Sequence, residues 1–174
     1  MNNNVRLVNA SIDIVFSSLE SNVDMFEKEF NTISEHDDDA IGQWLRTARA
    51  KGETSDSDPV TLHLIVELYR KMDRLEKLIL NQTPERIKLQ QTGMIEKIGL
   101  EYFELSEPLL DPAKHYYGRV ELPVLPRHET PIFFEAISPT LAKIIRMHVK
   151  DENEWSIYMT ARERAMIRHL KGFE

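Results

Sequence analysis

The strongest constraint on this chain is an apolar stripe that runs through residues 59–81. Asp58 can cap a helix there, and Pro59 at the first helical position loses no hydrogen bond. If Ile65 is heptad position a, apolar side chains occupy positions a, d and g. They are Leu64, Ile65, Leu68, Met72, Leu75, Leu78 and Ile79. This spacing predicts a long helix whose apolar face is wider than the seam of a two-stranded coiled coil.

An apolar face of this width needs a partner. The helix would be about 34 Å long at 1.5 Å per residue, longer than the helix expected just before it. Packing against the preceding helices of the same chain is one alternative, but those shorter helices would leave part of the face uncovered. An apolar patch of several hundred Å² seldom stays exposed on a monomer. We therefore expect self-association into a dimer or a tetramer.

The residues before this helix also show helical spacing. Between residues 10 and 30, apolar side chains recur at intervals of three, four and seven, which predicts one amphipathic helix. They are Ile12, Val15, Phe16, Leu19, Val23, Phe26 and Phe30. The acidic run 35–39 predicts the start of a second, shorter helix, ended by Gly52, rather than a metal site. Residues 1–82 are therefore expected to form a helical oligomerisation region.

The pattern changes after Thr83 and Pro84, which break the helix. Apolar side chains then alternate with polar ones in short runs, which predicts β-strands. The expected strands lie near residues 87–91, 98–102, 116–122, 132–137, 144–149 and 155–159. Polar residues 150–154 suit a hairpin, and Thr160 to Glu163 form a capping box that begins a final helix. Residues 83–174 are therefore expected to form a β-domain, which places the whole chain in the α+β class.

Composition disfavours several classes of function. The formal net charge is −7, so binding to nucleic acid or to an anionic membrane surface, which needs a basic face, is not expected. No apolar run approaches the roughly 18 residues of a membrane span, and the N-terminus does not resemble a signal peptide. We therefore expect a cytoplasmic protein without membrane insertion. The chain has no cysteine, which removes disulfides, thiolate metal sites and cysteine nucleophiles.

No set of residues in the sequence predicts catalysis. The six histidines show neither HxxxH nor HExxH spacing, so we expect no metal site. GxSxG, P-loop and GxGxxG motifs are absent as well, which leaves nucleotide hydrolysis and dinucleotide chemistry without support. We therefore expect no catalytic residues and no cofactor, and a binding or scaffolding role rather than an enzyme.

Three short motifs follow one another in the second half of the chain. They are Ile-Gly-Leu-Glu-Tyr-Phe at 98–103, Ser-Glu-Pro-Leu at 106–109 and Tyr-Gly-Arg-Val-Glu-Leu-Pro at 117–123. Together they resemble a PilZ domain over roughly residues 85–171. The resemblance implies a PilZ-like, six-stranded antiparallel β-barrel closed by a C-terminal helix, with residues 155–159 as the last strand.

The helical first half resembles the atypical, tetrameric branch of the PilZ family, in which a long heptad-bearing helix assembles four chains. This resemblance implies that residues 60–80 are the oligomerisation helix and that the protein is a homotetramer. PilZ domains are best known as receptors for the bacterial second messenger cyclic di-GMP. The implied role is signalling that is linked to this nucleotide.

Typical PilZ domains hold cyclic di-GMP with an Arg-x-x-x-Arg motif before the barrel and an Asp/Asn-x-Ser-x-x-Gly motif on the first strands. Guanidinium groups hold phosphates and stack on guanine, while short polar side chains bind base edges. In this chain Gly99 matches the glycine, but Glu96 occupies the serine position and Met94 the Asp/Asn position. Arg86, with Gln90 four residues later, is the nearest candidate for the arginine pair.

These departures lead to two hypotheses. A carboxylate at position 96 would repel a dianionic ligand, so we expect no cyclic di-GMP binding in the usual mode. The first hypothesis is therefore a non-enzymatic adaptor that self-assembles through its long helix and contacts a signalling protein that the sequence does not identify. The alternative is a true cyclic di-GMP receptor with a non-standard site that uses Arg86 and the arginines of the final helix.

Overall fold

The computed structural model of this 174-residue chain describes residues 6–20, 22–35, 40–82, 85–124 and 128–172. These residues form six strands and four helices, which confirms the expected α+β class. Their contacts divide the chain into two units, one of Met1–Phe30 with Lys88–Glu174 and one of Asn31–Ile87. Among the described residues, no helix has the length and apolar content needed to cross a bilayer.

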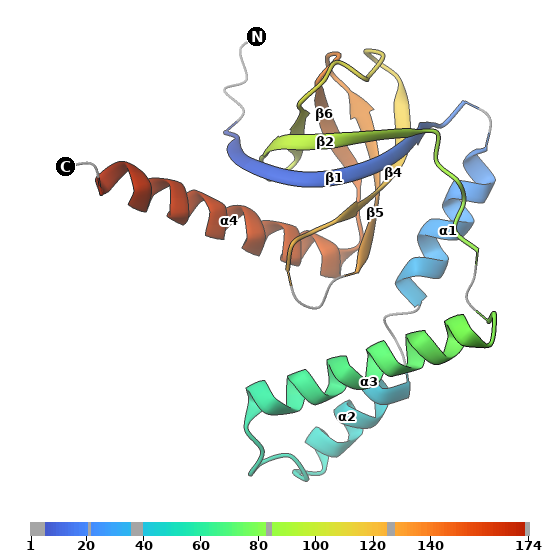
Figure 1. Cartoon of the computed structure of the whole chain (residues 1–174), viewed down its shortest axis with the longest axis vertical. Helices are drawn as coiled ribbons and strands as arrows, with labels where there is room; N and C mark the ends of the chain where they lie inside the picture. Colours follow the sequence, from blue (N-terminus) through green and yellow to red (C-terminus); the bar gives the residue numbers. More distant parts are fainter. Residues whose placement is uncertain (1–5, 21, 36–39, 83–84, 125–127, 173–174) are drawn as a thin grey trace. The chain divides into compact units, whose positions relative to one another are not determined.

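The six strands close into an antiparallel β-barrel (Figure 1). Around the barrel, the strand order is β1-β2-β3-β6-β5-β4. The strands are β1 (Val8–Ser18), β2 (Gln91–Ile98), β3 (Tyr102–Leu105), β4 (His115–Glu121), β5 (Glu129–Ala136) and β6 (Leu141–Arg146). Because β1 pairs with both β2 and β4, it closes the sheet, and this closure removes the exposed edges that favour aggregation.

Aromatic rings fill the middle of the barrel. Phe134 of β5 contacts the rings of Phe16, Phe103 and Tyr116 at centroid separations of 5.0 to 5.9 Å. All four side chains are at most 2% exposed. Gly118 of β4 permits this packing, because a Cβ there would lie 3.2 Å from the Phe134 ring and 3.0 Å from a carbonyl oxygen of β1. The middle of the barrel is therefore packed with side chains.

The helix expected over residues 10–30 is wrong in its first half, which is strand β1. Ile12, Ile14 and Phe16 are at most 2% exposed and alternate with more exposed side chains, which is the period of a strand. Helical spacing also fits this run because it is short and rich in apolar residues. Pairing with β2 and β4 decided between the two periods. The second half of the expected helix exists, as α1 (Val23–Glu35).

Two of the expected helices are confirmed in the unit Asn31–Ile87. They are α2 (Ala40–Ala50) and α3 (Pro59–Ile79), and the two helices contact each other. Gly52 follows α2 with φ of 76°, a left-handed conformation that glycine adopts without strain. The acidic run expected to begin α2 falls mainly on residues 36–39, which lie outside the described residues.

The start of α3 has the expected cap. Asp58 accepts hydrogen bonds from the Thr61 hydroxyl at 2.6 Å and the Thr61 backbone N–H at 2.9 Å, and Pro59 occupies the first helical turn. The first of these bonds contributes most to lowering the pKa of the Asp58 carboxyl below its ordinary value of 3.8. The ionised carboxylate is therefore the form that stabilises the helix.

We expect an Asp58→Ala variant to have lower α3 helicity and a lower Tm than the parent at pH 7. Because the folded-state pKa is depressed, the contribution of Asp58 is complete above pH 3.8 and is lost as pH falls through the lower folded value. The difference between parent and variant should therefore shrink in circular-dichroism melts below that pH. Asp56→Ala, in the loop before the cap, is the matched control. A difference that does not change with pH would contradict this role for Asp58.

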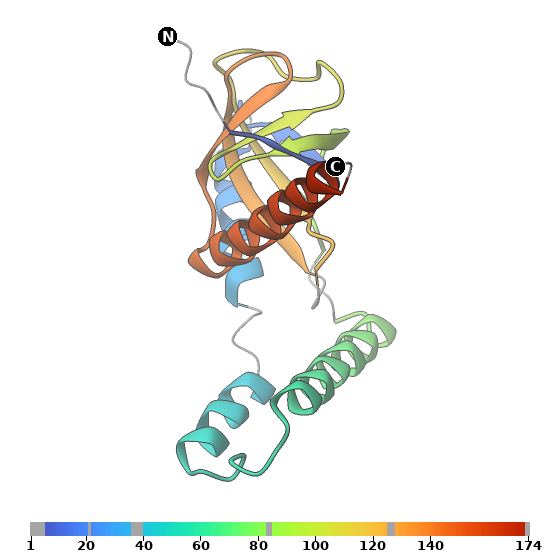
Figure 2. The ribbon, with the colours of Figure 1, turned by 90° about the vertical axis from the view of Figure 1, so that its left-hand side faces the viewer.

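A single helix, α4 (Val149–Lys171), replaces the hairpin at 150–154, the strand at 155–159 and the capping box. It lies next to β1 beside the barrel (Figure 2). Thr160 is inside this helix, where its hydroxyl donates to the Ser156 carbonyl at 2.8 Å, so it caps nothing. The expected last barrel strand is therefore wrong.

The side chains of α4 that face the barrel explain why these residues are helical. Trp155 is 1% exposed, and Tyr158 and Met159 pack against the same core. Residues at i, i+3 and i+4 share one face of a helix, whereas a strand would send Trp155 and Tyr158 to opposite sides. β1 supplies the sixth strand that the sequence analysis had assigned to residues 155–159.

The strand ends and the domain division also differ from the expectation. β2 begins at Gln91 rather than at Ile87, Leu100 lies in the β2–β3 turn, and β6 ends at Arg146. More importantly, the barrel does not begin at residue 83. Its first strand precedes all three helices α1 to α3, which are inserted between β1 and β2.

Candidate functional site

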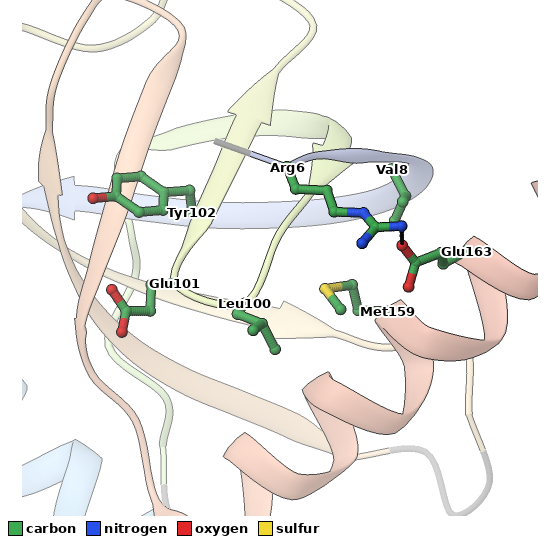
Figure 3. A pocket seen from close by; sticks show the side chains of 7 residues that line it. All are labelled: Arg6, Val8, Leu100, Glu101, Tyr102, Met159 and Glu163. Carbon is green, nitrogen blue, oxygen red and sulfur yellow. Dashed lines mark ion pairs between the residues drawn. The ribbon is translucent and has the colours of Figure 1, made fainter. Parts of the chain in front are cut away.

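A pocket of about 430 Å³ lies at one end of the barrel (Figure 3). Its walls come from three places: the residues that enter β1, the β2–β3 turn, and the inner face of α4. The lining residues are Arg6, Val8, Leu100, Glu101, Tyr102, Met159 and Glu163. Apolar walls with a few charged groups at the rim are typical of small-molecule sites.

Gly99, which directly follows β2, lies beside this pocket. Its N–H donates to the Tyr102 carbonyl at 2.7 Å, and its own carbonyl accepts the Trp155 indole N–H at 2.8 Å. A Cβ at position 99 would lie only 2.8 Å from the Arg6 carbonyl oxygen. Because glycine has no Cβ, the Arg6 backbone can lie close to the β2–β3 turn. Trp155 of α4 is hydrogen-bonded to the same residue.

One ion pair joins two of the lining residues at one side of the pocket (Figure 3). The Arg6 guanidinium contacts the Glu163 carboxylate, with side-chain exposures of 79% and 18%. Arg6 is exposed but Glu163 Oε1 is buried, so an anion that drew Arg6 away would leave a shielded carboxylate oxygen without its ion pair. Glu101 adds a second carboxylate to the lining. The pocket as it stands has one cation and two anions, which opposes a dianionic ligand unless Arg6 turns toward it.

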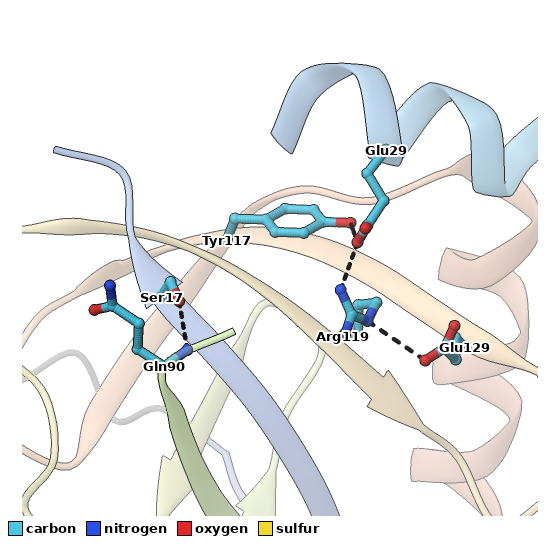
Figure 4. A network of polar contacts seen from close by, with 6 residues as sticks. All are labelled: Ser17, Glu29, Gln90, Tyr117, Arg119 and Glu129. Carbon is cyan, nitrogen blue, oxygen red and sulfur yellow. Dashed lines mark hydrogen bonds and ion pairs between the residues drawn. The ribbon is translucent and has the colours of Figure 1, made fainter. Parts of the chain in front are cut away.

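Of the four ligand-binding candidates from the sequence, three belong to the barrel unit and one to the other unit. Arg86 is exposed and belongs to the unit Asn31–Ile87. The Gln90 backbone N–H donates to the Ser17 hydroxyl at 2.8 Å, where β2 approaches β1 (Figure 4). Glu96 is exposed on β2, and Gly99 is the one of the three barrel candidates that lies beside the pocket.

Arg6 is the residue that sequence reasoning missed. Arg86 is the arginine nearest the expected start of the barrel at residue 83. Once β1 is known to be the first strand, Arg6 is the arginine that precedes the barrel, and its backbone touches Gly99. The alternation at Ile12, Ile14 and Phe16 was the signal that would have revealed it.

A second group of polar side chains links α1 to the barrel through hydrogen bonds (Figure 4). Glu29 of α1 accepts hydrogen bonds from the Tyr117 hydroxyl at 2.9 Å and from Arg119 Nη1 at 2.5 Å. Arg119 Nε also lies 3.4 Å from a Glu129 carboxylate oxygen. Glu29 and Arg119 are 7% and 9% exposed. Buried charges that face opposite charges and hydrogen-bond donors are typical of contacts that hold two elements together. We therefore interpret this network as structural.

The predicted oligomerisation face of α3 is exposed. Seven side chains of the stripe are between 52% and 79% accessible in the single chain. They are Leu64, Ile65, Leu68, Met72, Leu75, Leu78 and Ile79. Val66, at 4%, is the buried residue of α3, and Leu45 and Ala48 are those of α2, at 9% and 2%. Within the unit Asn31–Ile87, contact with α2 therefore leaves the stripe uncovered.

No family model, curated protein or solved structure matches the chain significantly. The fold places the chain among α+β proteins with a closed six-stranded antiparallel barrel and a helical insertion after the first strand. Any function must therefore be argued from the exposed face of α3, the pocket and the motifs of the sequence.

Proposed function

We propose that this chain is a non-enzymatic signalling adaptor of the PilZ type, which self-assembles through α3 and acts on another protein in cyclic di-GMP-linked signalling. The observation that carries this proposal is the exposed stripe of α3. All seven members are leucine, isoleucine or methionine. Six of these side chains are at least 55% exposed, and Leu78 is 52% exposed. On a surface helix such a continuous row needs a partner.

The energy available from covering this stripe is large. Burying one leucine, isoleucine or methionine side chain contributes roughly 1.5–3 kcal/mol. Seven such side chains per chain, even when only partly buried, supply on the order of 10 kcal/mol, which is comparable to the estimated cost of association of 4–15 kcal/mol. A stable assembly is therefore within reach of this face alone.

A second copy of the same helix is the partner that fits the stripe best. Apolar residues at a, d and g are typical of bundles with more than two helices. Lys71 at position g and Glu76 at position e lie beside the stripe and are five residues apart. In parallel helices, this spacing lets a g residue of one helix form an ion pair with an e residue of its neighbour. These features favour a parallel homotetramer, as the family resemblance implies.

The barrel supports the PilZ part of the proposal. A six-stranded antiparallel barrel with a C-terminal helix is the architecture that the three motifs implied. Gly99 of the first motif lies at the β2–β3 turn, and the Leu122-Pro123 of the third follows the end of β4. The motifs thus fall at strand ends and turns of the barrel, while the strand expected last is part of α4 and β1 supplies the sixth strand.

One observation favours the alternative, a receptor with a non-standard site. Arg6, the arginine before the barrel, and Gly99, the glycine after β2, meet beside the pocket of Figure 3. Such a receptor would use Arg6 to hold a phosphate and Tyr102 to stack on a base. Glu163 and Glu101 oppose it, which is why the adaptor remains the first proposal.

Two measurements on one sample of the purified chain test both proposals. Light scattering should give about four times the chain mass of 20.3 kDa, and a calorimetric titration with cyclic di-GMP should give no saturable heat. A monomeric mass would overturn the adaptor's assembly. Saturable heat that is lost in Arg6→Ala but kept in Arg86→Ala would replace the adaptor with a receptor that uses this pocket.

A further inference from the structure

Three side chains with metal-binding atoms meet where α4 begins. Asp151 and Glu154 are three residues apart on α4, so the helix places them on one face. His128 directly precedes β5. One imidazole nitrogen and two carboxylate oxygens from these residues all lie within 4.8 Å of one another. Their side chains are 5%, 22% and 15% exposed for Asp151, Glu154 and His128, so the group is largely shielded from water.

The separations suit coordination of one ion. His128 Nε2 lies 3.0 Å from Asp151 Oδ1 and 3.3 Å from Glu154 Oε2. Ligand atoms about 2.1 Å from a zinc ion, at angles between a right angle and the tetrahedral angle, are roughly 3.0–3.4 Å apart. Both nitrogen–oxygen separations therefore match those of ligands on one metal ion, and the two carboxylate oxygens lie within 4.8 Å of each other.

A single hydrogen bond from His128 Nε2 does not account for both of its close carboxylate contacts. In any protonation state, the Nε2 atom of His128 carries at most one hydrogen, yet two carboxylate oxygens lie within 3.3 Å of it. Only one of the two oxygens can receive a well-directed hydrogen bond from that nitrogen. A divalent cation replaces the single hydrogen, bonds to all three atoms at once, and neutralises the two negative charges that α4 holds together.

We propose that His128, Asp151 and Glu154 form a binding site for a divalent transition-metal ion, with zinc as the best match. One imidazole and two carboxylates suit zinc better than magnesium, which prefers oxygen ligands and keeps its waters. The three ligands leave a coordination position for water or for a group from a partner. Because the ligands come from α4 and from the residue before β5, the ion would tie the start of α4 to the barrel.

Sequence spacing did not reveal this site, because His128 and Asp151 are 23 residues apart. The test uses the full chain, freed of metal with a chelator and then titrated with Zn²⁺ by calorimetry and with Co²⁺ by visible absorption. The parent should bind one equivalent saturably, and its Tm should rise with Zn²⁺ because the ion binds the folded state. Mg²⁺ at the same concentration should produce no comparable heat.

Variants distinguish Zn²⁺ binding at this site from Zn²⁺ binding by histidines elsewhere on the surface. Glu154→Gln keeps the size of the side chain but removes its charge, and it should weaken Zn²⁺ binding at least about tenfold. His128→Ala should weaken it at least as much. Glu152→Gln, in the first turn of α4 but exposed, should bind as the parent does.

The proposal is overturned if the parent shows no saturable binding of Zn²⁺ or Co²⁺. It is overturned equally if Glu154→Gln, with a parent-like circular-dichroism spectrum, binds as tightly as Glu152→Gln. If His128→Ala does not fold, the comparison of the two glutamate variants decides the question alone. Neither outcome depends on the oligomeric state or on cyclic di-GMP, so this site and the adaptor proposal are tested separately.

Discussion

A Leu68→Glu, Leu75→Glu double variant should scatter light as a single chain of 20.3 kDa, whereas the parent should scatter as about four chains. Both side chains are at the d positions of the α3 stripe and are 59% and 58% exposed, so a charge there costs the single chain little. In an assembly, the same carboxylates would be buried without partners. Each would then cost several kcal/mol, which is enough to dissociate the bundle.

The control must add a charge to α3 without touching the stripe. His63→Glu does so, since residue 63 is exposed at heptad position f and the change in formal charge equals that of one Leu→Glu substitution. It should keep the parent's mass. Circular dichroism should show the same helix content in all three proteins. A double variant that keeps the parent's mass would contradict assembly through α3.

Trp155→Ala should lower the free energy of unfolding of the barrel by about 3–5 kcal/mol, the usual cost of removing a buried large aromatic side chain. The indole is 1% exposed and joins the core from α4. Its N–H donates to the Gly99 carbonyl at 2.8 Å, so the substitution also leaves that buried acceptor without its donor. For a domain of ordinary stability, such a loss is a large share of the total.

Urea denaturation followed by circular dichroism measures this effect. Ile157→Ala is the matched control, because residue 157 is on the same helix but 67% exposed, and its loss should stay below about 1 kcal/mol. Similar midpoints for the two variants would show that α4 does not anchor the barrel through Trp155. The same Trp155→Ala variant should also disturb the pocket, since Gly99 holds the turn that forms one of its walls.

The helices α2 and α3 could be predicted from the sequence because their signals are local. The Asp58 cap acts on Thr61, three residues away, and Pro59 and Gly52 limit the backbone at their own positions. Periodic apolar spacing over about six turns left no competing strand interpretation for α3. Its exposure followed from the same pattern, since α2 is too short to cover it.

The wrong helix before residue 20 and the wrong strand at residues 155–159 concern segments whose structure depends on distant partners. In β1, Ile14 pairs with Gly93 on one side and with Val120 on the other, about 80 and 105 residues away. Residues 155–159 contain a tryptophan, an isoleucine and a tyrosine, which favour a strand by propensity. Burial of Trp155 under the barrel outweighed that preference and made them helical.

The sequence by itself determined the α+β class, the α2–α3 pair and the apolar stripe that leads us to propose assembly. Each depends on composition or on interactions between residues three to seven positions apart, which can be read along the chain. Only the tertiary structure decided that Val8–Ser18 completes the barrel, that Arg6 meets Gly99, and that His128 meets Asp151 and Glu154. Strand pairing and burial bring these residues together from distant parts of the chain, and no short spacing in the sequence records that proximity.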